Sequence, residues 1–438
     1  MQNLTSNNLY DYRASKYPIQ DWFKIVEGFS TDFVENRLQK YAITSGARVL
    51  DPFGGAGTTA LVCKYKGVKA ISIDANPWMC LVASAKTTWD IDLSELKESS
   101  DFVLSCIPIA HIKNEELVGF QTEDQGKIFA VGVNPIVLDS KDIPALPRLE
   151  KKMSPNVLRK VLFLKEIIQK TVQDKRLTDT TQRLLWATFG AHLMRVSNMT
   201  WYGPKVSWKK KFLVDAPVFT LFRDLLRKVY TDLNAVRVVS QPHAETEVIL
   251  GDARQVDTHV PSQVDLAITS PPYMNEACYT DQSQFELFFL GFVRNLQDLR
   301  NVKRRLLTCN TKYIFSDTND GDQIRWFDPV MRIHQELVRN EKREEKRWGW
   351  NRPKMLLDYF GGMKSNLESV FKVLRKDARY DLIIGDSAIG GIHIPTDELV
   401  AKLAIELGYS RAAVEPFRKR QSSRHNTQLR ESIVTLTN

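Results

Sequence analysis

Two short segments carry residue types that could bind a small molecule and act on a planar substrate. The first, DPFGGAGTT at 51–59, follows a short apolar run, and its glycines let the backbone turn sharply and approach a ligand closely. The residues after it begin a helix, whose first N–H groups are free to bind. An acid precedes the glycines and no basic residue stands ready for phosphates, so the loop favours a cationic or amino-bearing ligand over a pyrophosphate. A tight structural turn is the alternative for this motif alone.

A second acid follows the loop at the spacing of a strand-loop-helix-strand unit. The apolar run from Val68 to Ile73 ends on Asp74. An acid at the end of the strand after a glycine-rich loop can accept hydrogen bonds from ribose hydroxyls. A solvated surface acid is the alternative interpretation.

The second segment, TSPPY at 269–273, follows the buried run QVDLAI and is predicted at the carboxyl edge of the sheet, where doubly wound folds bind ligands. Pro271 and Pro272 fix two φ angles and remove two N–H donors, which leaves carbonyl acceptors exposed. The Tyr273 ring can stack on a planar base. The pattern fits a planar substrate with an amino group, although alone it is equally typical of a plain turn.

These motifs lie in two regions where strands and helices alternate, which predicts an α/β fold with a doubly wound mixed sheet. Between them, from about Ile91 to about Ala244, lie ~150 residues, far more than an ordinary loop holds. We expect a folded insertion that begins with short strands and turns and is mainly helical from about 155 to 236. The segment 416–430 is expected to be a basic edge loop before the last strand.

Composition narrows the class of protein. The 438 residues carry a formal charge of +9, which favours a polyanionic partner. No apolar run approaches the ~20 residues of a membrane span, and the amino terminus has no signal-like apolar region. The five cysteines are scattered without a C-x-x-C spacing, so we expect reduced cysteines, no structural metal site and a cytoplasmic location.

FGGAGTT followed by SPPY resembles the S-adenosylmethionine-dependent DNA methyltransferases that modify exocyclic amino groups. DANPWMCLVASAKT at 74–87 and GDAR at 251–254 are similar to two further motifs of that family, and YRASKYP at 12–18 to its segment over the methionine end of the cofactor. The resemblance implies a Rossmann-like methyltransferase fold and no metal. It also implies S-adenosylmethionine as cofactor, S-adenosylhomocysteine as product, and a set of cofactor-binding residues: Tyr17, Pro18, Asp51, Pro52, Phe53, Gly54, Gly55, Ala56, Gly57, Thr58, Asp74, Ala75, Asn76, Asp252 and Ala253.

The order of the motifs resembles the family branch in which a target-recognition region separates the cofactor motif from SPPY. The resemblance then implies a catalytic domain in two parts, 1–92 and 245–438, around a recognition insertion at 93–244. A smaller insert at about 293–352 is basic, with 13 Lys and Arg against 8 acids within 301–354. Solvated charged faces are the alternative for each basic segment. Candidate DNA-binding residues are Lys209, Lys210, Lys211, Arg347, Trp348, Trp350, Arg352, Arg418, Arg420 and Arg424.

The family implies that a base is flipped out of the duplex and that Ser270, Pro271, Pro272 and Tyr273 form the catalytic loop. Serine before Pro-Pro-Tyr is more typical of N4-cytosine enzymes than of N6-adenine enzymes, so cytosine is the first choice and adenine the second. An RNA or protein-amide methyltransferase and a non-catalytic DNA-binding protein are the remaining alternatives. Expected partners are double-stranded DNA and, in a restriction-modification system, a cognate endonuclease. The resemblance also implies a prokaryotic or phage-encoded protein.

Overall fold

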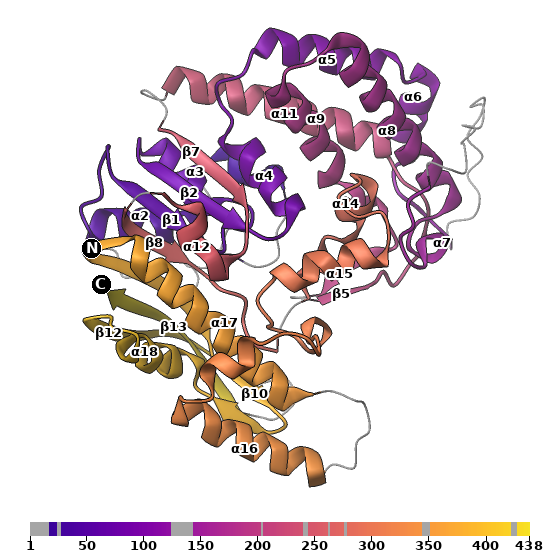
Figure 1. Cartoon of the computed structure of the whole chain (residues 1–438). Coiled ribbons are helices and arrows are strands. Elements are labelled where there is room, and N and C mark those ends of the chain that lie inside the picture. Colours follow the sequence, from indigo (N-terminus) through magenta and orange to yellow (C-terminus); the bar gives the residue numbers. More distant parts are fainter. Residues whose placement is uncertain are drawn as a thin grey trace.

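The computed structural model describes residues 17–23, 28–123, 143–202, 205–239, 244–261, 263–275, 278–343, 351–421 and 427–438. Its main sheet has seven strands in the order β12-β13-β9-β8-β1-β2-β7, parallel except for the pairings of β13 (Figure 1). The doubly wound mixed sheet predicted from the sequence is therefore confirmed. The strands are β1 (Arg48–Asp51), β2 (Lys69–Asp74), β7 (Thr246–Leu250), β8 (Val264–Thr269), β9 (Leu374–Gly385), β12 (Arg411–Gln421) and β13 (Gln428–Thr437).

Side chains alternate along the central strands between two hydrophobic cores, one on each face of the sheet. Val49 and Leu266 belong to one core, whereas their neighbours Leu50 and Ala267 belong to the other. This period of two is what a strand buried on both faces requires. The first face is covered by α2 (Thr31–Lys40), α3 (Thr58–Tyr65) and α4 (Pro77–Thr87), and the second by α12 (Val256–His259), α17 (Arg352–Val373) and α18 (Thr396–Glu406).

The chain between α4 and β7 is mainly helical, as predicted, and lies beside the sheet rather than within it (Figure 1). The expected strands and turns at its start fall largely on residues 124–142, outside the described residues. None of the described helices is both long and apolar enough to cross a membrane. The elements are α5 (Leu93–Ser105), α6 (Ile109–Val118), β3 (Gln121–Thr122), α7 (Leu149–Lys152), α8 (Pro155–Lys175), α9 (Asp179–Ala191), α10 (Leu193–Val196), β4 (Met199–Tyr202), β5 (Lys205–Trp208), β6 (Leu213–Asp215) and α11 (Val218–Val239).

This helical part is joined to the sheet-containing part through a short 3-10 helix, η2 (Pro18–Trp22), near the amino terminus. The Trp22 indole N–H donates to Asp232 Oδ2 of α11 at 2.8 Å, and both side chains are buried. Helix α9 packs on α4 from the same side. The cofactor motifs on β1 and β2 therefore lie next to the helical part.

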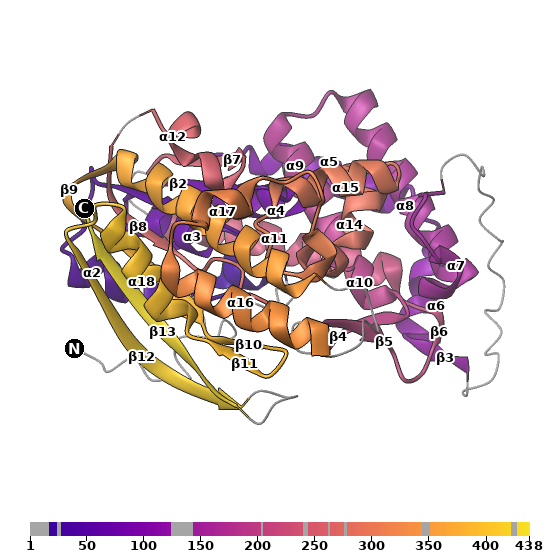
Figure 2. The same ribbon diagram turned by 60° about the horizontal axis from the view of Figure 1, so that its bottom comes forward.

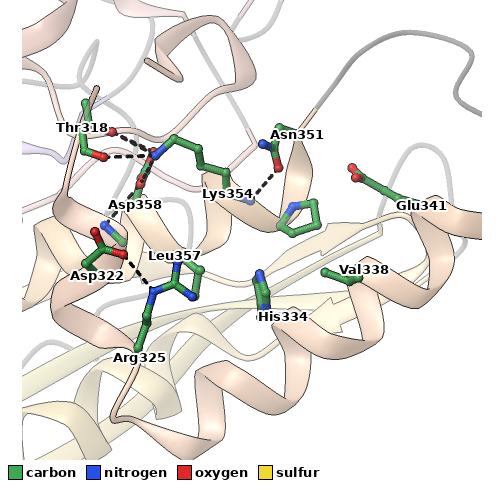
Figure 3. A pocket seen from close by; sticks show the side chains of 12 residues that line it. Thr318, Asp322, Arg325, His334, Val338, Glu341, Asn351, Lys354, Leu357 and Asp358 are labelled. Atoms are coloured by element: carbon green, nitrogen blue, oxygen red, sulfur yellow. Dashed lines mark hydrogen bonds and ion pairs between the residues drawn. The ribbon is translucent and has the colours of Figure 1, made fainter. Parts of the chain in front are cut away.

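A second group of elements separates β8 from α17 and encloses a cavity of about 800 Å³ between η7, α16 and α17 (Figure 3). Two ion pairs line it, Asp322 with Arg325 and Asp358 with Lys354. Helix α16 packs on the small sheet of β10 (Ser387–Ile389) and β11 (Ile392–Ile394) (Figure 2). The elements between β8 and α17 are α13 (Tyr279–Gln282), α14 (Gln284–Phe289), α15 (Leu296–Arg305), η6 (Thr311–Tyr313), η7 (Asp320–Ile324) and α16 (Asp328–Arg343), whereas the short 3-10 helix η5 (Ala253–Gln255) lies before β8.

The basic segment 416–430 was expected to be an edge loop, and this expectation is wrong for most of its length. Strand β12 continues to Gln421 and pairs with β13 down to Gln428, so the two form one long hairpin (Figure 2). An edge strand held by backbone hydrogen bonds needs no alternation of apolar residues, and its register shifts at Pro416, where edge strands tolerate proline. The hairpin places Arg418 and Arg420 on its exposed strand.

Candidate active site

The glycine-rich loop between β1 and α3 lies directly against β2. Gly54 N–H donates to the Ile73 carbonyl at 2.8 Å, and a Cβ on Gly54 would lie 1.8 Å from Ser72 Oγ. Gly57 has φ of +77° and faces Ala83 of α4, 2.8 Å from where its own Cβ would be. Both positions therefore require glycine, one for space and the other for both space and a left-handed backbone.

Asp51, at the end of β1, joins this loop to the SPPY segment. Its Oδ1 accepts a hydrogen bond from Thr269 Oγ1 at 2.6 Å, and its Oδ2 accepts one from Thr59 Oγ1 at 2.7 Å. The carboxylate also accepts from Phe53 N–H at 3.2 Å. Burial raises the pKa of Asp51 to about 6, although these hydrogen bonds oppose the rise. Neither Thr269 nor Thr59 was among the predicted site residues. The signal that could have identified Thr269 is its position at the end of the buried strand, directly before SPPY.

Asp74 ends β2 and stands opposite the turn of the loop. Its Oδ2 accepts from Gly55 N–H at 2.9 Å and its Oδ1 from Asn76 N–H at 2.7 Å. Burial raises the pKa of this carboxyl to about 6, with the two backbone hydrogen bonds opposing the rise. The carboxylate is thus fixed at the carboxyl edge of the sheet, with further lone-pair positions for hydroxyl donors.

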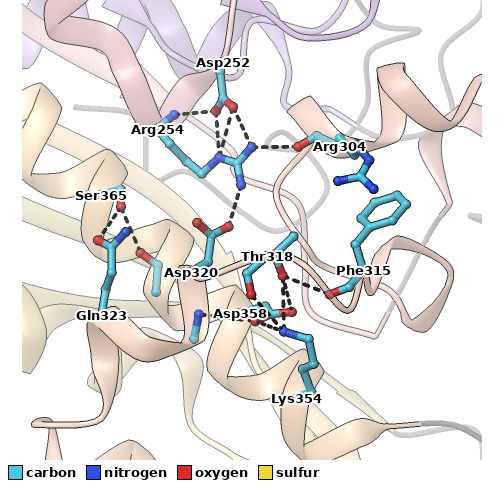
Figure 4. Close-up of polar contacts among 12 residues, drawn as sticks. Asp252, Arg254, Arg304, Phe315, Thr318, Asp320, Gln323, Lys354, Asp358 and Ser365 are labelled. Atoms are coloured by element: carbon cyan, nitrogen blue, oxygen red, sulfur yellow. Dashed lines mark hydrogen bonds and ion pairs between the residues drawn. The ribbon is translucent and has the colours of Figure 1, made fainter. Parts of the chain in front are cut away.

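Asp252 follows β7 and is held by an arginine two residues further on (Figure 4). Arg254 Nη2 lies 2.6 Å from Asp252 Oδ2 and donates to the Arg304 carbonyl at 2.8 Å. The same guanidinium pairs with Asp320 of η7 at 2.5 Å. The loop after β7 is therefore connected to the elements that precede α17.

The SPPY loop packs on the end of β9. The Ser270 hydroxyl donates to the Ile383 carbonyl at 3.4 Å, and Ser387 Oγ donates to the Met274 carbonyl at 2.9 Å. The Tyr273 ring lies so close to Gly385 that a Cβ there would be 2.7 Å from ring atom Cδ2. Gly385 was not predicted as a site residue, because only its contact with the Tyr273 ring explains why a glycine is needed there.

Four segments far apart in the sequence converge on one cavity at the carboxyl edge of the sheet. The predicted residues that line it are Asp51, Pro52, Phe53, Gly54, Gly55, Ala56, Thr58, Asp74, Ala75, Asn76, Asp252, Ala253, Ser270 and Pro272. Residues that line it without having been predicted include Gln20, Phe23, Phe29, Met79, Lys86, Arg254, Tyr279, Arg305 and Leu307. The cofactor motifs and part of the SPPY loop therefore share one space.

Five predicted residues do not belong to the cavity lining. Gly57, Pro271 and Tyr273 adjoin lining residues along the chain, whereas Tyr17 packs its ring on Tyr65 with centroids 4.2 Å apart. The Pro18 carbonyl accepts a hydrogen bond from Lys228 Nζ at 3.4 Å on the side of the helical part. The segment near the amino terminus contributes Gln20 and Phe23 instead.

Six of the candidate DNA-binding residues belong to the part of the chain that the structure describes, and they lie after β5, at the start of α17 and on β12. Lys209, Lys210 and Lys211 follow β5, which packs against α13, and Lys209 Nζ donates to the Arg195 carbonyl at 2.7 Å. Burial lowers the pKa of Lys209 to about 8. Arg352 begins α17, and Arg418 and Arg420 each approach Glu431 at 3.5 Å. Arg347, Trp348, Trp350 and Arg424 lie outside the described residues.

Comparison with known proteins agrees with this geometry. The chain is 22% identical to the type II methyltransferase M.BsoBI of Geobacillus stearothermophilus over 466 aligned positions, which cover 95% of this chain and 84% of that protein. It is a distant homologue of type II methyltransferases. M.AvaI of Nostoc sp. is 24% identical over 92% of this chain and 82% of its own length. M.MjaII of Methanocaldococcus jannaschii is 36% identical over 70 residues, 16% of the chain. No family model matches.

Proposed function

We propose that this type II methyltransferase homologue is a site-specific DNA methyltransferase of a restriction-modification system. It transfers a methyl group from S-adenosylmethionine to an exocyclic amino group of a flipped base. N4 of cytosine is our first choice for this group, and N6 of adenine is the second. One observation carries this proposal: Ser270 and Pro272 line the same cavity as the glycine loop and Asp74, and the Asp51–Thr269 hydrogen bond fixes the two loops relative to each other. A methyl donor and an amino acceptor can then meet in one space.

The cavity residues fit the cofactor by their chemistry. The Asp74 carboxylate suits the ribose hydroxyls, and Asp252 suits the adenine amino group, since both acids are held in place by other donors. Gly55 lines the cavity without a side chain and allows close approach of the ligand. The cofactor supplies an activated methyl group on a sulfonium, so the protein needs to provide neither a metal nor a covalent nucleophile.

The protein's task is then to orient the amino nitrogen of the base. Its lone pair is delocalised into the ring, and acceptors that bind the amino hydrogens favour a pyramidal nitrogen with its lone pair aimed at the methyl. Ser270 Oγ and the Pro271 carbonyl are the proposed acceptors. Tyr273, whose ring lies against Gly385, is the proposed stacking platform. The contribution is positioning together with fixed dipoles.

Recognition of DNA is assigned to residues 93–244, with help from 293–352 and from the β12–β13 hairpin. The basic segment Lys209–Lys211 follows strand β5, and β5 packs against α13, whose Tyr279 and Gln282 line the cavity. A phosphate-binding segment at this position is near the proposed reaction site. Ion pairs such as Arg304–Asp317 and Lys312–Asp281 neutralise part of the positive charge of the 293–352 region. We therefore expect this region to make fewer contacts with the DNA phosphates than its composition indicates.

The test is to incubate the purified chain with S-adenosylmethionine and duplex DNA and to measure methylated nucleosides by mass spectrometry. We expect N4-methylcytosine. N6-methyladenine instead would overturn the choice of base but not the class. Methylation of RNA alone would identify the RNA enzyme, and binding of DNA without any methyl transfer would favour a non-catalytic DNA-binding protein.

A further inference from the structure

One lining residue of the cofactor cavity is a buried lysine that the sequence motifs do not explain. Lys86 lies in the last turn of α4, and its side chain is 1% exposed. Its ammonium donates to Gln20 Oε1 at 3.2 Å, and Gln20 Nε2 donates in turn to Thr58 Oγ1 at 3.0 Å. All three residues line the cavity. The lysine is therefore held at the end of the cavity where α3 begins.

Lys86 has no matching anion in the part of the chain that the structure describes. No carboxylate there lies within ion-pair distance of its ammonium, and Asp21 acts on it only from further away. Asp232 of α11, whose charge acts on Asp21, already pairs with Lys228 and with Trp22. Burial lowers the pKa of Lys86 to about 7. Burying an uncompensated ammonium is costly, so this position is one where an anionic ligand group would be stabilised.

The start of α3 adds to the positive potential at the same end. Helix α3 begins at Thr58, and its N-cap residue Gly57 provides no side chain to accept the first N–H groups. Those groups carry the positive end of the helix dipole. The two acids proposed for ribose and adenine, Asp74 and Asp252, line the same cavity on the loops after β2 and β7. The cavity thus contains cationic and acidic groups on different elements.

This arrangement of acids and a cation suits the groups of S-adenosylmethionine. Its adenosine part offers hydroxyl and amino donors to the acids, and its methionine part carries a carboxylate in addition to the positive ammonium and sulfonium. We propose that Lys86 binds the carboxylate of the cofactor's methionine part, with Gln20 as the positioning residue that aims the ammonium and Thr58 at the start of α3 beside it. This inference rests on the proposed function, since it names the group that recognises one end of the cofactor.

Two other cations line the cavity and are the competing sites for the carboxylate. Arg254 is already paired with both Asp252 and Asp320. Arg305 is the last residue of α15 and precedes Leu306 and Leu307, which also line the cavity. Arg305 is therefore the alternative that the experiment has to exclude.

The test compares the affinity of the full-length chain for two ligands by calorimetry: S-adenosylmethionine and its decarboxylated form, which keeps the sulfonium and the adenosine. We expect Lys86→Met to bind S-adenosylmethionine about 30-fold more weakly than the wild type, as for loss of one partner of a buried charge pair. Its affinity for the decarboxylated form should change by less than about threefold, since that ligand has no group to pair with Lys86. Lys86→Arg should recover part of the loss.

Lys64→Met is the matched control, because Lys64 is a partly buried lysine of α3 that does not line the cavity and whose ammonium donates to the Ala244 carbonyl at 3.2 Å. It should leave both affinities unchanged. Equal losses for both ligands in Lys86→Met, or a loss specific to S-adenosylmethionine in Arg305→Met instead, would overturn the assignment. A wild-type chain that binds neither ligand would instead overturn the proposed function itself. Melting curves of each variant check that the fold is intact.

Discussion

The close contact between the glycine loop and β2 gives a prediction whose size follows from the geometry. In Gly54→Ala the new Cβ would lie 1.8 Å from Ser72 Oγ and 3.1 Å from Ser72 Cβ. Non-bonded heavy atoms prefer ~3.5–4.0 Å, so either the Ser72 hydroxyl rotates or the loop moves away from β2. Movement of the loop would break the Gly54–Ile73 hydrogen bond and pull Gly55 N–H from Asp74. Ser72 is 1% exposed, which leaves its hydroxyl little room to rotate.

Overpacking of this kind costs ~1–3 kcal/mol. If the cofactor-free protein relieves this strain by moving the loop, cofactor binding has to move the loop back, and the cost corresponds to a loss of roughly 5- to 150-fold in affinity. We therefore expect Gly54→Ala to weaken cofactor binding within that range in calorimetric titration. Ser72→Ala removes the atom that is 1.8 Å away and leaves the contact at 3.1 Å, so the double variant should recover most of the affinity. Ser72→Ala alone is the control and should bind like the wild type.

The double variant decides whether the reasoning is right. If Gly54→Ala binds the cofactor normally, the loop does not need its position against β2. If the double variant is as weak as Gly54→Ala, the loss does not come from the contact with Ser72.

Two further predictions concern the acid at the end of β2 and the SPPY loop. Ribose hydroxyls bind the charged form of Asp74, whose pKa burial raises to about 6, so cofactor affinity should fall as the pH drops through 6. Above pH 7 the affinity should fall as well, because Lys86, whose pKa burial lowers to about 7, loses the charge proposed to bind the carboxylate. Asp74→Asn should bind more weakly at pH 7 and lose most of the fall on the acid side in titrations from pH 5 to 7, and an unchanged fall there would exclude Asp74 as its source. Gly385→Ala would put a Cβ 2.7 Å from the Tyr273 ring, so methyl transfer to DNA should fall at least about tenfold while cofactor affinity changes less than about twofold. Normal transfer rates in Gly385→Ala would show that the position of the Tyr273 ring is not needed.

The sequence predicts the parts of this protein that depend on local patterns. Asp51 and Asp74 end apolar runs, and the ends of neighbouring parallel strands meet at one edge of a sheet, so their proximity follows from the α/β alternation. The glycines at 54–57 predict the turn between β1 and α3, because glycine lets the backbone turn sharply. The mainly helical part between 155 and 236 follows from its 3.6-residue periodicity.

The residues that the sequence does not reveal act through contacts between distant segments. Thr269 is 218 positions from Asp51, so the sequence does not show that they form a hydrogen bond. Gly385 looks like any other glycine in the sequence, and only the structure shows its contact with the Tyr273 ring. Lys86 lies in the last turn of a helix, where a lysine normally points to solvent, and only the packing of η2 and α3 shows that it is buried. The last strand was expected, but its partner β12 was missed because the pairing of β12 depends on backbone hydrogen bonds rather than on apolar alternation.

The central claim is that the glycine loop and the SPPY loop form one site for methyl transfer to a base. The most direct measurement follows labelled methyl groups from S-adenosylmethionine into duplex DNA, for the wild type and for Tyr273→Ala, with cofactor affinity measured in parallel. We predict that the wild type labels the DNA and that Tyr273→Ala binds the cofactor but fails to label it. A wild-type chain that binds the cofactor and leaves duplex DNA unlabelled, or a Tyr273→Ala variant that is fully active, would contradict the account.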